Sequence, residues 1–127
     1  MAMDLQIMES GAADDPLRLP PEKVQWFRDA KIGLFIHWGL YSLTDGGEWS
    51  MFLDRIDVDE YAKRADQFKG QHFDASVLAG LAQRLGAKYS YMTTRHHDGF
   101  CLYNSACSDF TTVKTSAGRD FIAEYLK

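Results

Sequence analysis

Histidine side chains gather at two points in this sequence where an apolar run ends, and a glutamate followed by a tryptophan lies between those points. Imidazole, carboxylate and indole groups can together bind a polar ligand, and the first two can hold a metal ion. The candidate polar residues are His37, Glu48, His96 and His97, and the tryptophan that follows Glu48 is Trp49. The remaining histidine, His72, precedes an expected helix and stands apart from this set.

Recognition of a sugar is the chemistry that these residue types fit best. Imidazole and carboxylate groups hydrogen-bond vicinal hydroxyls, while Trp38, Trp49 or Phe100 packs on the apolar face of the sugar ring. A metal site with Glu48 or Asp98 as its third ligand is the alternative, although the order His-His-Asp lacks the spacing of specific metal motifs. A third interpretation has the histidines capping strand carbonyls and both tryptophans filling the core. This structural interpretation suits any one of these residues alone, but the occurrence of His37, Glu48, His96 and His97 together favours a ligand-binding role.

The elements that must position these side chains follow an alternating pattern. Residues 31–39 and 87–94 are short apolar runs that predict two strands, the first of them buried on both faces. Helices are expected over residues 57–68 and 74–86, each opened by an aspartate cap. Strand, helix and strand in this order predict an α/β fold with a parallel sheet, whose carboxyl-end edge carries the active residues.

The rest of the chain is organised around that unit. Prolines open an expected helix that ends at Ala30, residues 119–127 predict a last helix, and residues 40–53 predict a loop. Residues 1–19 are expected to form a loosely ordered lead-in to a domain over residues 20–127. The helix faces expected to be buried comprise Trp26, Phe27, Ala30, Tyr61, Ala62, Ala65, Phe68, Val77, Leu78, Leu81, Ala82 and Leu85.

Composition narrows the function classes. The 127 residues are 46% hydrophobic, and 14 basic against 18 acidic side chains give a formal charge of −4. This charge disfavours nucleic acid and anionic membranes as partners. No apolar stretch approaches the roughly 20 residues of a membrane span, and no secretory signal is visible, so a cytoplasmic location is expected. Cys101 and Cys107 are expected to be free thiols.

Read together, these motifs closely resemble the α-L-fucosidases of glycoside hydrolase family 29. The resemblance rests on F-I-H-W-G at residues 35–39, G-E-W at residues 47–49 and H-H-D-G-F at residues 96–100, and it extends from about Trp26 to the end of the chain. It implies a retaining exo-glycosidase that removes terminal α-L-fucose through a covalent glycosyl-enzyme. The implied partner is a fucosylated oligosaccharide or glycoside, and the family requires neither a metal nor another cofactor.

The resemblance also assigns roles and a fold. It implies that His37, Glu48, His96 and His97 bind fucose hydroxyls and that Trp49 lies beside them. The implied fold is a (β/α)8 TIM-like barrel, of which this chain carries about the first two strand-helix units.

One part of the family pattern has no counterpart in this sequence. The aspartate nucleophile and the acid/base carboxylate of the family match no position here, whereas a retaining mechanism needs two carboxyl groups roughly 5 Å apart. A whole barrel takes about 250 residues. We therefore expect either a missing carboxy-terminal part of the barrel or a homo-oligomer that completes it. A non-catalytic fucose-binding or self-assembling module is the alternative function.

Overall fold

The structure is a computed structural model that describes residues 19–127, so the expected lead-in lies almost wholly outside the described residues. The chain divides after Lys31 into two units. The first contains α1 (Pro21–Ala30), which begins at a proline as predicted and has no buried residue. Trp26 and Phe27, predicted as its buried face, are both exposed, and that prediction is wrong because their rings pack edge-to-face on each other, with centroids 5.7 Å apart, instead of entering a core.

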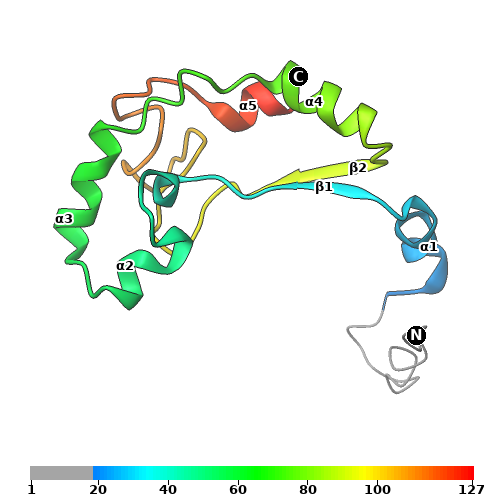
Figure 1. The fold of residues 1–127 in the computed structure, drawn as a ribbon, viewed down its shortest axis with the longest axis horizontal. Coiled ribbons are helices and arrows are strands. Elements are labelled where there is room, and N and C mark those ends of the chain that lie inside the picture. The colour runs from blue at the N-terminus through cyan, green and yellow to red at the C-terminus, as the bar shows by residue number, and fades with distance from the viewer. Residues whose placement is uncertain (1–18) are drawn as a thin grey trace. The chain divides into compact units, whose positions relative to one another are not determined.

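The second unit, Ile32–Lys127, is an α/β structure (Figure 1). Its elements in chain order are β1 (Gly33–Ile36), the 3-10 turns η2 (Leu40–Leu43) and η3 (Gly47–Trp49), α2 (Ser50–Leu53), α3 (Val58–Ala62), the 3-10 turn η4 (Lys63–Asp66), α4 (Ala75–Arg84), β2 (Tyr89–Met92) and α5 (Phe121–Tyr125). The predicted loop over residues 40–53 is therefore wrong. Local hydrogen bonds, such as Thr44 N–H to the Tyr41 carbonyl at 3.0 Å, form short helical turns that need no apolar periodicity.

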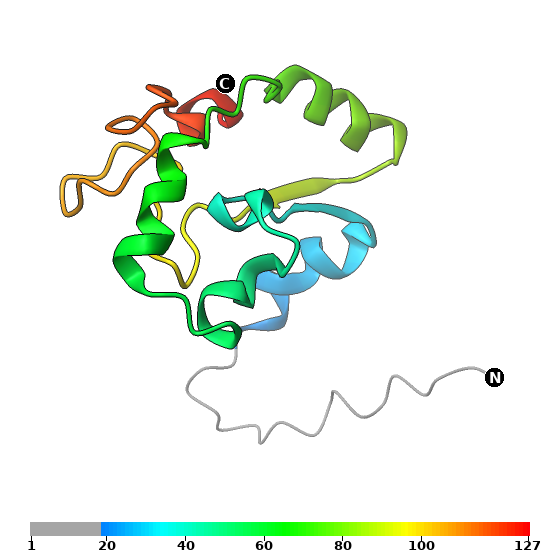
Figure 2. The same cartoon turned by 60° about the vertical axis from the view of Figure 1, so that its left-hand side comes forward.

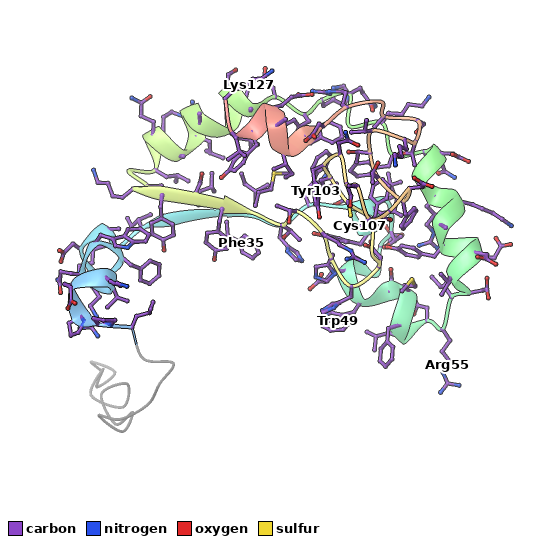
Figure 3. The ribbon with its side chains drawn as sticks, turned by 180° about the vertical axis from the view of Figure 1, so that it is seen from behind. Phe35, Trp49, Arg55, Tyr103, Cys107 and Lys127 are labelled. Carbon is purple, nitrogen blue, oxygen red and sulfur yellow. The ribbon has the colours of Figure 1, made fainter. Side chains whose placement is uncertain are left out.

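The two predicted strands pair in parallel, as expected. Phe35 of β1 lies opposite Tyr91 of β2, and their rings stack with centroids 4.4 Å apart. These two rings are 49% and 51% exposed, so the prediction of a strand buried on both faces is wrong. Within the second unit, α4 and α5 lie on the same side of the sheet in both views (Figures 1 and 2), and Figure 3 shows Phe35 on the opposite side.

The helices begin where the sequence predicted. The Asp57 carboxylate accepts hydrogen bonds from the first N–H groups of α3, and the Asp74 carboxylate does the same for α4. Of the apolar stripe expected over residues 57–68, Tyr61, Ala65 and Phe68 are buried. No residue of α4 is buried. The stripe of α4 is correctly spaced, yet nothing among the described residues covers it completely.

The core lies beyond the carboxyl ends of the strands rather than under the sheet. Its buried members come mostly from the segments that follow β1 and β2, together with α3, η4 and α5, and they are Leu40, Tyr61, Ala65, Phe68, Met92, Phe100, Leu102 and Phe121. Figure 1 shows these segments gathered at one end of the sheet. The most firmly packed part of the unit is therefore the part that carries the candidate site.

Candidate functional site

The site begins where the parallel ladder ends. Ile36 is paired with Met92, so His37 and Thr93 are the next pair along the two strands. The Thr93 N–H donates to the Ile36 carbonyl at 3.0 Å, which holds the two strand ends together. Residues at equivalent positions of neighbouring strands share a face. The His37 Nδ1 atom lies 2.9 Å from the Thr93 hydroxyl accordingly.

The carboxylate and the indole come from η3. This turn is entered through Gly46 and begins at Gly47, whose φ of +68° favours glycine. Glu48 Oε1 lies 3.9 Å from His37 Nε2. Trp49 is 47% exposed and tilts over the ring of His97, with centroids 4.5 Å apart. The local turn thus delivers a charged acceptor and an open aromatic face to the same place.

A tight turn after β2 supplies the other two histidines. The strand ends at Met92, before the histidine pair, so strand alternation does not force His96 and His97 apart, and their rings lie 4.5 Å from each other. Asp98 builds the turn: one carboxylate oxygen accepts the Phe100 N–H at 2.9 Å, and the other accepts the Tyr61 hydroxyl at 3.2 Å. Asp98 thus ties the turn that carries His96 and His97 to α3.

All five candidate residues converge. The His96 ring lies 5.0 Å from that of His37 and 6.3 Å from that of Trp49 between centroids. Together with the contacts of Glu48 and His97 given above, these distances show that the five side chains form one group. We call this group the histidine cluster, and its members are His37, Glu48, Trp49, His96 and His97. It presents imidazole nitrogens, a carboxylate and an indole face from three separate segments.

Burial sets the charge of the central histidine. Desolvation lowers the pKa of His96, and the neighbouring His97 and His37 lower it further when they are protonated. The His96 ring is therefore neutral at neutral pH, with one nitrogen that donates and one that accepts. Its Nδ1 atom is buried and makes no hydrogen bond within the described part of the chain.

The three aromatic residues proposed to pack on the sugar lie in different environments. Trp38 packs against the core rings of Phe68 and Phe121, with centroids 4.8 and 5.0 Å away, and Phe100 is buried. Trp38 and Phe100 thus pack in or against the core, and Trp49 is the open aromatic ring that lies beside the histidines. Among residues 19–127, no three His, Cys, Asp or Glu side chains are arranged to hold a metal ion.

Two residues of the site were not predicted. Tyr41, from η2, is buried and lies with its ring 5.1 Å from His37 and 5.0 Å from His96 between centroids. Burial raises the pKa of Tyr41 to about 12, so its hydroxyl stays protonated. Thr93 is the second. Aligning the two predicted strand ends in parallel would have paired Thr93 with His37, but no pattern in the sequence marks Tyr41.

Residues 14–127 match the model of the alpha-L-fucosidase family. The chain belongs to this family. It is 35% identical over 116 residues to the plasma alpha-L-fucosidase of Rattus norvegicus, an alignment that covers 78% of this chain and 25% of that protein. The alpha-L-fucosidase of Dictyostelium discoideum is 31% identical over 125 residues, with 80% and 27% covered.

Solved fucosidase structures share the fold of this part. Alpha-L-fucosidase isoenzyme 1 from Paenibacillus thiaminolyticus superposes with a TM-score of 0.79 at 45% identity, over 82% of this chain and 25% of that one. A family 29 enzyme from Bacteroides thetaiotaomicron, trapped as a covalent intermediate with 2-fluoro-fucosyl fluoride, gives 0.79 at 36% identity, over 91% and 29%. The chain spans about a quarter of the length of the curated relatives it matches.

Within the described residues, no helix is long and apolar enough to cross a membrane. Cys101 is buried and Cys107 is exposed, and both are free thiols, as predicted.

Proposed function

We propose that this chain takes part in the hydrolysis of terminal α-L-fucose from fucosylated glycans or glycosides by a retaining mechanism. Its own contribution is the wall of the site that recognises the sugar. The observation that carries this proposal is the convergence of the histidine cluster at the carboxyl ends of two parallel strands, the place where α/β enzymes bind their ligands.

The spacing of the cluster suits a hydroxyl group. His37 Nε2 and Glu48 Oε1, at 3.9 Å, are too far apart to hydrogen-bond each other directly. A hydroxyl oxygen about 2.8 Å from each atom would accept from the imidazole and donate to the carboxylate. Trp49 would then cover the apolar face of the sugar, and His96 and His97 would bind neighbouring hydroxyls.

The chemical step needs more than this cluster. Retention requires a nucleophile and an acid/base roughly 5 Å apart. Glu48 is the one carboxylate in the histidine cluster, and the two oxygens of Asp98 accept hydrogen bonds from Phe100 in its own turn and from Tyr61 of α3. We therefore place the two catalytic carboxylates outside these 127 residues. The length of the relatives and the half-exposed rings of Phe35 and Tyr91 support a partial (β/α)8 barrel that further strands or a second copy complete.

A fucose-binding module without hydrolysis is the second candidate for the isolated chain. It is favoured by the same observation, that the cluster offers recognition groups with a single carboxylate. Binding and turnover separate the two functions, because a module would bind L-fucose saturably and leave a chromogenic α-L-fucoside intact.

The test combines mass with turnover. Light scattering of the purified chain gives its oligomeric state, and hydrolysis of nitrophenyl α-L-fucoside is measured on the same fractions. Hydrolysis by a defined oligomer that is abolished in Glu48→Ala but kept in Glu22→Ala supports a site completed by association. Inactive chain that regains turnover when mixed with the remaining part of the barrel supports a divided site. Turnover that Glu48→Ala leaves unchanged would refute the proposed role of the cluster.

A further inference from the structure

The hydroxyl of Thr93 touches His37 from the side away from Glu48. Thr93 is fixed by its own backbone, because its N–H donates to the Ile36 carbonyl at 3.0 Å as the last bond of the parallel ladder. Its Oγ1 atom lies 2.9 Å from His37 Nδ1, a full hydrogen bond. The other ring nitrogen, Nε2, faces Glu48 Oε1 at 3.9 Å.

These two neighbours choose between the tautomers of a neutral imidazole. A neutral histidine carries its proton on one nitrogen and a lone pair on the other. A lone pair on Nε2 would point toward the negative carboxylate of Glu48, which is unfavourable, whereas an Nε2–H is attracted to it. Nδ1 must then accept, and the Thr93 hydroxyl is the group placed to donate to it. The partner of one ring nitrogen thus decides what the other presents.

The hydrogen bond with Thr93, and not the surrounding packing, fixes which way the His37 ring is turned. Around His37 lie the rings of Phe35, Tyr41 and His96, with centroids 5.3, 5.1 and 5.0 Å away. These contacts restrict the plane of the imidazole, but carbon edges and ring faces do not distinguish the nitrogens of the ring from its carbons. A ring turned by 180° about its Cβ–Cγ bond would fill similar space but exchange each nitrogen for a carbon, so that Cε1 instead of Nε2 would face Glu48.

We infer that Thr93 is a positioning residue that donates its hydroxyl proton to His37 Nδ1 and so keeps the Nε2–H of His37 directed at the ligand side of the histidine cluster. This inference rests on the proposed function, because it gives His37 the donor half of a donor and acceptor pair with Glu48. One sugar hydroxyl can then accept from His37 and donate to Glu48 at the same time.

The first test reads the tautomer directly and needs no ligand. The full chain is labelled with 15N-histidine, and long-range 1H–15N spectra are recorded at about pH 8, where an ordinary imidazole is neutral. The inference predicts an unprotonated Nδ1 and a protonated Nε2 for His37 in the unmodified chain. A protonated Nδ1, or equal averaging of the two nitrogens, would overturn it, and this measurement does not depend on any variant folding.

Variants then test whether Thr93 is the cause. Thr93→Val removes the hydroxyl at nearly constant shape and leaves Glu48 alone to bias the tautomer, so the share of His37 that carries its proton on Nδ1 should rise, while Thr93→Ser should restore the single tautomer. Thr94→Val makes the same chemical change one residue away and should change nothing. A single tautomer that survives in Thr93→Val would remove Thr93 from the role.

Binding of L-fucose separates this inference from the proposed function. A lost hydrogen bond to His37 should weaken the affinity of Thr93→Val by about two- to tenfold, with Thr93→Ser close to the unmodified chain. If L-fucose shifts no resonance while the His37 tautomer is fixed through Thr93, the positioning role stands and the proposed function fails. If the sugar binds and Thr93→Val leaves the affinity and the tautomer unchanged, the positioning role fails alone.

Discussion

Removing the Tyr61 hydroxyl should loosen the turn that presents His96 and His97. Tyr61 is buried, and its hydroxyl donates to Asp98 Oδ2 at 3.2 Å. Tyr61→Phe keeps the ring in the core and deletes only this bond. Hydrogen bonds to charged groups contribute roughly 1.5 to 3 kcal/mol, and the 3.2 Å distance is long for an O–H donor, so we expect a loss near the lower limit, about 1.5 kcal/mol.

Urea unfolding followed by circular dichroism measures this loss. Tyr91→Phe is the matched control, because the Tyr91 ring is half exposed on the sheet, and it should change the free energy of unfolding by less than about 0.5 kcal/mol. A double-mutant cycle with Asp98→Asn should give a coupling energy of about 1 kcal/mol or more. Equal stability of Tyr61→Phe and the unmodified chain, or zero coupling, would refute the structural role given to Asp98.

Three further outcomes are expected. The pKa of His96 is lowered in the folded chain, so its neutral form stabilises the fold above the unfolded pKa near 6.5. This contribution to the free energy of unfolding is lost as the pH falls through the folded pKa. Chemical unfolding at several pH values should therefore show a smaller loss of stability on acidification in His96→Gln than in the unmodified chain. Gly70→Ala places a Cβ 2.4 Å from Phe121 Cζ at a φ of +56° and should cost about 2 kcal/mol or more in urea, whereas Gly86→Ala, at a φ of +70° with open space around it, should cost about 1 kcal/mol. Trp49→Ala should weaken L-fucose binding in calorimetry by about two- to tenfold and lower stability by less than about 1 kcal/mol, and a loss of folding instead would place this ring in the core.

Local signals account for what the sequence predicted well. The helix starts at Asp57 and Asp74 depend on a side chain and the next few N–H groups, and both caps are present. The parallel pairing of the strands follows from the helix between them. The convergence of His37 with His96 then follows from topology, since carboxyl ends of parallel strands share one edge.

Burial could not be predicted in the same way, because it depends on what lies opposite a face. Val77 and Leu85 have the spacing of a core stripe but remain exposed, as do Phe35 and Tyr91 on the sheet. The burial of the two tryptophans differs for the same reason. Trp38 packs against Phe68 of the core, whereas Trp49 lies open beside the histidines. The role of Thr93 could not be predicted from its residue type, because only the strand register brings it to His37.

Direct observation of the histidine cluster during a sugar titration tests the central claim. The labelled chain is titrated with L-fucose and, separately, with its mirror image D-fucose, which has identical composition and polarity. We predict saturable changes at His37, His96, His97 and the Trp49 indole with L-fucose, and none with D-fucose. Equal responses to both sugars, or no response at any of these side chains, would contradict the assignment of this cluster to fucose recognition.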